Sequence, residues 1–139
     1  SELEMASTTD MQPVSFTSES AFVRGVADVV IDRGTTAFIF DFKTGKKRPK
    51  PEQLNLYAAL YAVANPQTEK FVASFLWLQE KDITTYSFNK TEALRGIEWA
   101  KEVSRKIQLD MERERWQEKP SAMCRWCPAK SICPSGKRY

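Results

Sequence analysis

The segment Thr36–Lys43 (Thr-Ala-Phe-Ile-Phe-Asp-Phe-Lys) constrains the fold more than any other part of the sequence. Its β-branched and aromatic residues, recurring at a period of two, predict a β-strand. Alternation places one set of side chains on each face: Ala37, Ile39, Asp41 and Lys43 on the first, and Phe38, Phe40 and Phe42 on the second. Because the phenylalanines are the larger apolar set, we expect their face to form the core. Asp41 and Lys43 then project side by side, about 6–7 Å apart along the strand.

The residues before this strand predict its antiparallel partner. Residues 22–31 are rich in valine, and Gly34 in the connection suits the positive φ of a tight turn. With a two-residue turn at Arg33 and Gly34, Asp28 faces Ile39, and Asp41 faces Val26. Facing side chains share a sheet face, so Asp28 lies on the face of Asp41, as a diagonal neighbour about 6–8 Å away. A four-residue turn preserves this parity, whereas a single bulge breaks it.

The other apolar patterns predict one mixed α/β or α+β domain, with a central mixed sheet of about four to five strands flanked by helices. The first ten residues form a short polar segment that could belong to a helix. The further predicted elements are a strand at 14–17, a helix at 52–64 stopped by Asn65 and Pro66, a hairpin of 71–78 with 83–88, and a long helix that opens at an Asn89–Glu92 capping box and ends at Pro120. We expect a single domain over residues 1–139, with 120–139 as a cysteine-containing C-terminal segment.

The chain contains no histidine, which removes the commonest general base and every Ser-His or Cys-His arrangement. Any chemistry must then use carboxylates, lysines, thiols or a metal. The net charge of +3 identifies no partner, but the first 20 residues hold four acids and no base, so the remainder is moderately basic. The sequence has no apolar run of 18 residues and no signal pattern at its start, so we expect an intracellular, cytoplasmic protein without a membrane partner.

Two carboxylates converging on one sheet face would repel each other unless a cation lay between them. A hard divalent ion such as Mg²⁺ or Mn²⁺ suits Asp28 and Asp41, because it takes one or two carboxylates and completes its shell with water and substrate phosphate. Such an ion lowers the pKa of bound water, and Lys43 beside it can orient or deprotonate the attacking water. By itself, however, an Asp-x-Lys strand is more often a solvated face or an ion pair.

Three short motifs occur in order: Gly-Val-Ala-Asp at 25–28, Phe-Asp-Phe-Lys-Thr-Gly at 40–45 and Gln-Leu-Asn-Leu-Tyr at 53–57. Together they resemble the PD-(D/E)XK nuclease superfamily, and within it the RecB-like branch, which is marked by G-x-x-D, D-x-K-T-G and Q-x-x-x-Y. The resemblance implies a restriction-endonuclease-like core and assigns these roles: Asp28, Asp41 and the Phe42 main-chain carbonyl as metal ligands, Lys43 as the catalytic lysine, and Gln53 and Tyr57 as auxiliary helix residues.

The same resemblance implies a Mg²⁺- or Mn²⁺-dependent DNA nuclease, and it favours exonuclease action because the branch is rich in exonucleases. RecB-like nucleases often carry a further His or Glu ligand on a leading helix, for which only Glu2 or Glu4 could stand in here. This gap supports an alternative reading, a catalytically silent nucleic-acid-binding module of the same fold.

Cys124, Cys127 and Cys133 form a C-x2-C-x5-C pattern that suits zinc or an iron-sulfur cluster, although each normally takes four protein ligands. The spacing resembles that of iron-sulfur-containing viral and CRISPR-associated RecB-like nucleases, which add one upstream cysteine; a viral origin fits this resemblance. The upstream cysteine is absent here. The open interpretations are a site with a non-cysteine fourth ligand, a lost cluster that retains its motif, a truncated N-terminus, free or partly disulfide-bonded thiols, and a small zinc-binding adaptor.

The loop after the Asp-x-Lys strand is basic and contains Lys46, Lys47, Arg48 and Lys50. Such a run can follow a phosphate backbone, although most charge runs are solvated loops. Tryptophans and cations near the end could add stacking and phosphate contacts: Trp116, Trp126, Arg113, Arg115, Arg125 and Lys130. No residue pattern reads base edges, so we expect DNA binding with little sequence specificity.

Overall fold

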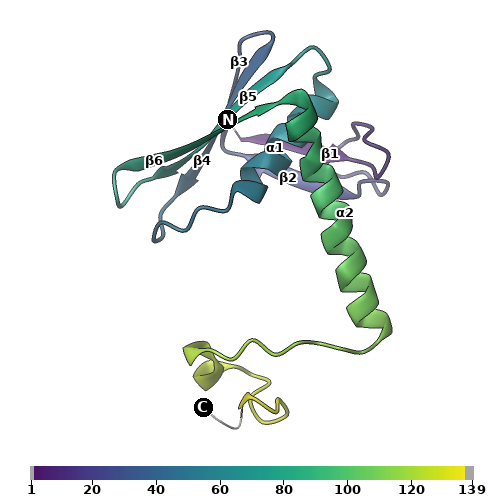
Figure 1. Cartoon of the computed structure of the whole chain (residues 1–139), viewed down its shortest axis with the longest axis vertical. Coiled ribbons are helices and arrows are strands. Elements are labelled where there is room, and N and C mark those ends of the chain that lie inside the picture. The colour runs from purple at the N-terminus through teal and green to yellow at the C-terminus, as the bar shows by residue number, and fades with distance from the viewer. Residues whose placement is uncertain (1, 137–139) are drawn as a thin grey trace. The chain divides into compact units, whose positions relative to one another are not determined.

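The structure, a computed structural model, describes residues 2–136, and the chain divides into two compact units, Ser1–Ser104 and Arg105–Tyr139. Figure 1 shows the elements in chain order. They are β1 (Leu3–Ser7), β2 (Val23–Ala27), β3 (Val29–Asp32), β4 (Thr36–Lys43), α1 (Pro51–Ala64), β5 (Lys70–Trp77), β6 (Asp82–Asn89), α2 (Lys90–Glu112) and a 3₁₀ helix (Ala122–Trp126). No helix among residues 2–136 combines the length and apolarity needed to cross a membrane.

The first unit contains a four-stranded mixed sheet in the order β3-β4-β5-β6 and a separate β1-β2 pair. The central pair, β4 and β5, is parallel, and every other pair is antiparallel. Helix α1 contacts both sheets (Figure 1). The predicted mixed α+β class, with a central mixed sheet flanked by helices, is therefore confirmed, and it is consistent with a restriction-endonuclease-like core.

The predicted turn between β3 and β4 is present, and Gly34 takes a φ of +75° there. Asp32 organises it, because its Oδ1 accepts the Gly34 N–H at 2.6 Å and its Oδ2 accepts the Tyr61 hydroxyl at 2.8 Å. The predicted register is wrong by two residues, since Asp32 pairs with Ala37 rather than facing Thr35. The wider loop preserves the predicted parity of the sheet faces.

The single strand predicted at residues 22–31 is broken at Asp28 into β2 and β3, which belong to different sheets. The strand predicted at residues 14–17 is wrong. The Arg24 guanidinium donates to the carbonyls of Phe16 and Ser18 at 2.6 and 2.7 Å, and so ties this segment to β2 as turns. The polar start of the chain contains a strand instead, because β1 pairs with β2 along its whole length.

The expectation that the phenylalanine face of β4 forms the core is also wrong. Ala37 and Ile39 are fully buried and Asp41 is 4% exposed, whereas Phe42 is 44% exposed. The buried face shares a core cluster with Leu54 and Ala58 of α1. Small side chains on both elements let the helix lie close to the sheet, so α1 covers the face that carries Asp41.

The predicted capping box opens α2, since the Asn89 and Glu92 side chains each accept the other's main-chain N–H at 2.9 Å. Helix α2 packs closely on α1: a Cβ at Gly96 would lie 2.8 Å from the Asn55 carbonyl. The helix ends at Glu112 rather than at Pro120. Glu114, at a φ of +50°, closes a Schellman motif in which the Arg115 N–H donates to the Asp110 carbonyl at 2.9 Å.

Candidate active site

Asp41 lies near the end of β4 on the face that α1 covers, and its carboxylate is buried. Its Oδ1 accepts a hydrogen bond from Gln53 Nε2 at 3.2 Å. Its Oδ2 forms an ion pair with Lys43 Nζ at 2.6 Å but has no hydrogen-bond partner among the described residues. A buried carboxylate oxygen without a hydrogen bond is costly, and it is a suitable ligand for a cation.

Lys43 is the last residue of β4, and its side chain remains partly exposed. Besides the ion pair with Asp41, its Nζ lies 5.4 Å from the centre of the Phe75 ring. Its main-chain carbonyl accepts the Leu78 N–H at 2.9 Å, which joins the end of β4 to the end of β5. The ammonium is thus held between a carboxylate and an aromatic face while still reaching solvent.

Asp28 occupies the break between β2 and β3, and its Oδ2 accepts the Phe42 main-chain N–H at 2.6 Å. Val29 pairs with Phe40, so the next position in that register sets Asp28 opposite Asp41. This placement puts Asp28 at the end of β4 that carries Asp41. That the two carboxylates converge on one metal ion stays a prediction. The break in the strand, which the sequence pattern did not reveal, turns the Asp28 carboxylate onto β4.

Gln53 and Tyr57 lie one turn apart in the first half of α1. Gln53 Nε2 donates to Asp41 and also to the Tyr57 hydroxyl, at 2.9 Å. Burial is the main cause that raises the pKa of Tyr57, the Gln53 hydrogen bond lowers it, and the Asp41 charge raises it further. Gly25 allows β2 to approach here, since a Cβ would lie 2.8 Å from Leu60 Cδ1 and 3.1 Å from the Tyr57 ring.

The residues present fit a divalent cation, because the buried Asp41 Oδ2 has an ion pair but no hydrogen bond, and Asp28 lies at the same end of β4. Within residues 2–136, no group of three or more Cys, Asp or Glu side chains could hold a metal ion. The Phe42 carbonyl therefore stays a predicted ligand. Of the two candidate N-terminal acids, Glu2 lies one position beyond the β1–β2 pair Leu3–Ala27, toward Asp28, while Glu4 lines a separate cavity of about 320 Å³.

The three cysteines are free thiols in the second unit, and Cys124 Sγ accepts the Ser121 N–H at 3.3 Å. They do not form a metal-binding group within the part of the chain that the structure describes. Their ligand role stays a prediction. Nearby, the Arg125 guanidinium lies 5.6 Å from the centre of the Trp126 ring, and Trp126 and Trp116 are both well exposed.

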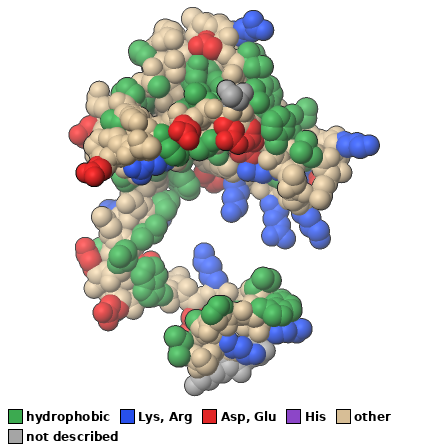
Figure 2. Space-filling view, turned by 180° about the vertical axis from the view of Figure 1, so that it is seen from behind, with side chains coloured by type: hydrophobic (Ala, Val, Ile, Leu, Met, Phe, Trp, Pro, Cys, Tyr) green, Lys and Arg blue, Asp and Glu red, His purple; other side chains and the backbone are tan. Residues whose placement is uncertain are grey.

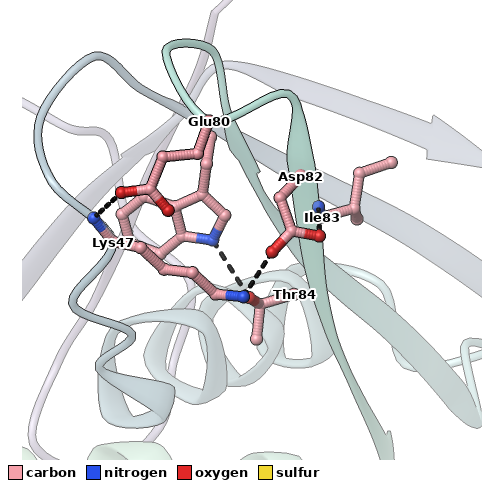
Figure 3. A network of polar contacts seen from close by, with 6 residues as sticks. Lys47, Glu80, Asp82, Ile83 and Thr84 are labelled. Carbon is pink, nitrogen blue, oxygen red and sulfur yellow. Dashed lines mark hydrogen bonds and ion pairs between the residues drawn. The ribbon is translucent and has the colours of Figure 1, made fainter.

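All four cationic residues of the basic loop are exposed, and Figure 2 shows Lys and Arg side chains projecting together from one edge of the first unit. Lys47 differs from its neighbours, because its main-chain N–H donates to Glu80 Oε1 at 2.8 Å and its Nζ pairs with the Asp82 carboxylate (Figure 3). The sequence pattern did not predict this pairing; its signal is the acidic pair Glu80 and Asp82, which lies where β5 turns into β6.

The family model of the PD-(D/E)XK nuclease superfamily matches residues 2–134. The chain therefore belongs to the PD-(D/E)XK nuclease superfamily, which confirms the predicted resemblance at that level. That superfamily consists of nucleases, which generally use Mg²⁺ or Mn²⁺.

No curated protein matches the chain. Among solved structures, the crystal structure of SSO0001 is similar at 18% sequence identity and a TM-score of 0.42. The match covers 98% of this chain and 59% of that one, so the chain spans less than two thirds of that protein.

Proposed function

We propose that this chain is a Mg²⁺- or Mn²⁺-dependent deoxyribonuclease of the RecB-like branch that degrades DNA from its ends with little sequence specificity. The observation that carries the proposal is the buried Asp41 carboxylate, which has Gln53 on one oxygen and Lys43 on the other. Asp28 lies at the same end of β4. Each of the three sequence motifs (residues 25–28, 40–45 and 53–57) thus contributes a residue near the end of β4.

In this proposal, Asp28, Asp41 and the Phe42 carbonyl hold the metal, which when bound activates water and neutralises charge on the phosphate. Lys43 Nζ orients the attacking water and stabilises the negative charge that develops on the phosphoryl oxygens. Gln53 restrains the Asp41 carboxylate and keeps it hydrogen-bonded to α1. Burial raises the pKa of Tyr57, so its hydroxyl can donate or accept a hydrogen bond at the site without ionising.

Sequence-independent binding would come from cations on the backbone and aromatic rings on the bases. The exposed loop cations Lys46, Arg48 and Lys50 are available for phosphate contacts beside the site. In the second unit, the exposed Trp126 carries Arg125 over its ring, which suits a base that stacks on the other face. The exonuclease assignment rests on the motifs of the branch alone.

We treat residues 1–139 as one nuclease domain with 120–139 as its cysteine segment, because the family match runs across both compact units. Within that segment, we propose that Cys124, Cys127 and Cys133 are three ligands of an iron-sulfur cluster whose fourth ligand is not a cysteine. An anaerobic absorption spectrum after reconstitution with iron and sulfide tests this. Broad absorption near 400 nm that is lost in Cys127→Ser is expected, and its absence contradicts the cluster.

A digestion assay tests the function directly. Linear and covalently closed circular DNA are incubated with the chain in Mg²⁺, Mn²⁺ or EDTA, with Asp41→Asn as the matched inactive variant. We expect linear DNA to shorten in either metal while the circle survives, and no loss in EDTA or with the variant. Cleavage of the circle contradicts end dependence, and activity in EDTA or in Asp41→Asn contradicts the metal site.

A second candidate, the catalytically silent DNA-binding module, is favoured by one observation: among residues 2–136 the site brings together no third acidic or cysteine side chain. Titration with Mn²⁺, followed by its paramagnetic resonance signal, separates the two functions. Binding that is lost in Asp41→Asn supports the nuclease. No binding, together with retained DNA affinity, supports the module.

A further inference from the structure

One residue of the loop between β4 and α1 (residues 44–50) joins this loop to the turn between β5 and β6 (residues 78–81) and to the first residue of β6. Lys47 uses both its main chain and its side chain for this, donating to Glu80 Oε1 at 2.8 Å and pairing with Asp82 through Nζ (Figure 3). The two segments are more than 30 positions apart in the sequence, so the contact is a tertiary one. We call these three residues, Lys47, Glu80 and Asp82, the loop clamp.

Within the clamp, Asp82 is also held by a contact that does not involve Lys47. Asp82 Oδ1 accepts the Ile83 main-chain N–H at 2.8 Å, and the neighbouring Trp77 Nε1 donates to Thr84 Oγ1 at 3.0 Å across the β5–β6 pair. The hydrogen bond with Lys47 is the main cause that lowers the pKa of Asp82, and the same bond raises the pKa of Lys47. Both shifts favour the charged forms that make the ion pair.

The place of the clamp in the chain links it to the site. The loop begins directly after Lys43, which pairs with Asp41, and it ends at α1, whose Gln53 donates to Asp41. Within the loop, Gly45 has no atom near the position of a Cβ, and the loop cations are exposed. Among the residues that the structure describes, Lys47 is the one that hydrogen-bonds this exposed loop to the β5–β6 hairpin.

We propose that Lys47 is a positioning residue: its contacts with Glu80 and Asp82 hold the loop in the conformation that contacts the DNA backbone. The phosphate contacts themselves fall to Lys46, Arg48 and Lys50. The inference rests on the proposed function, since it takes DNA as the substrate. The alternative model is a uniform basic patch, in which Lys47 itself binds a phosphate.

The variant Asp82→Asn separates the two roles by the sign of its effect. It removes a negative charge and releases Lys47, so a phosphate-binding Lys47 would make DNA binding tighter. Loss of a positioning contact makes it weaker, by about two- to fivefold for an exposed ion pair. The measurement is fluorescence anisotropy of labelled linear DNA in EDTA, where cleavage does not interfere. Binding as tight as wild type, or tighter, overturns the proposal.

Two further variants complete the test. The reciprocal swap Lys47→Asp/Asp82→Lys restores the pair with inverted polarity, and we expect affinity above that of Lys47→Asp alone. No recovery in the swap contradicts the clamp. Lys46→Ala is the matched control, because it should lower the slope of log affinity against log salt by about 0.9, as expected when one phosphate contact is lost. An unchanged slope removes Lys46 from the proposed contacts and overturns that part of the proposal.

Hydrogen exchange distinguishes failure of the clamp from failure of the proposed function. Amides of residues 44–50 should exchange faster in Asp82→Asn than in wild type, while the melting temperature stays the same. This readout requires neither DNA nor activity. A wild-type chain that binds no DNA contradicts the proposed function, whereas unchanged loop exchange in the variant contradicts the positioning role.

Discussion

The two compact units of the chain are stabilised by different means. The first unit buries large apolar side chains, including Phe71, Phe75 and Ile39, in one cluster beneath α1. In the second unit, Ser135 and Gly136 are the only buried residues among those described, and the exposed fractions of Trp116 and Trp126 are 66% and 68%. Units of fewer than about 40 residues usually need a metal, disulfides or a partner to be stable. The residues of the candidate site therefore lie in the unit with the larger buried core.

The largest predicted effect is the loss of cleavage rate when Lys43, in the first unit, is replaced. Lys43→Met removes the ammonium beside Asp41 while keeping an apolar stem over the Phe75 ring. We expect the rate constant for cleavage to fall about 10²- to 10³-fold, as when one electrostatic stabiliser of a transition state is removed. Single-turnover digestion of linear DNA measures it. Lys46→Met is the matched control, and a loss of similar size in that variant would contradict the special role of Lys43.

Some local features of the first unit could be predicted because each depends on residues that lie close together in the sequence. Gly34 in its turn, the Asn89–Glu92 box and the end of α1 before Asn65 each depend on neighbouring residues. The same holds for the candidate site, since Asp41 and Lys43 share a face of β4 and Gln53 lies one turn from Tyr57. Fixed spacing within a strand or a helix determines these relations.

Other features of the fold could not be predicted from the sequence, because they depend on contacts between segments that are distant in the chain. The buried face of β4 depends on the small side chains of α1, so the three phenylalanines misled the prediction. The strand break at Asp28 follows from β2 pairing with β1 rather than joining the main sheet. Residues 3–7 have good helix formers, yet pairing with β2 outweighs that weak preference. The Lys47–Asp82 pair joins segments that are distant in the sequence.

The next effect tests whether packing in the first unit supports its site. Gly25→Val places side-chain atoms where a Cβ already lies 2.8 Å from Leu60 and 3.1 Å from Tyr57. Overpacking of this kind costs about 1–3 kcal/mol of unfolding free energy. Urea denaturation measures the cost, and Gly45→Ala, where a Cβ meets nothing, is the control and should change it by less than about 0.5 kcal/mol. Equal stability of the two variants would show that β2 need not approach α1 closely.

A substitution in the second unit should have a smaller effect, and it should change DNA affinity rather than the cleavage rate. Trp126→Ala removes an exposed ring that stacks on DNA bases in the proposed function. Loss of about 1 kcal/mol of stacking weakens affinity for single-stranded DNA about fivefold. Anisotropy titration measures the affinity, and the cleavage rate at saturating DNA should not change. Trp99→Ala, an exposed tryptophan of the first unit, is the control; an equal loss there would remove the distinction between the units.

The smallest predicted effect is a change with pH in the free energy of unfolding, which arises from Tyr61 in the first unit. Burial, followed by the hydrogen bond to Asp32, raises the pKa of Tyr61 from 10.0 to about 12. Because the folded-state pKa lies above the unfolded one, the protonated phenol stabilises the fold fully below pH 10, and this contribution is lost as the pH rises toward 12. Tyr61→Phe removes the hydrogen bond at a cost of about 1 kcal/mol near neutral pH. Urea unfolding at pH 8, 10 and 11.5 should therefore show the difference between wild type and variant shrinking with pH. A difference that stays constant over this range means that the pKa of Tyr61 does not change on folding, which contradicts the predicted shift.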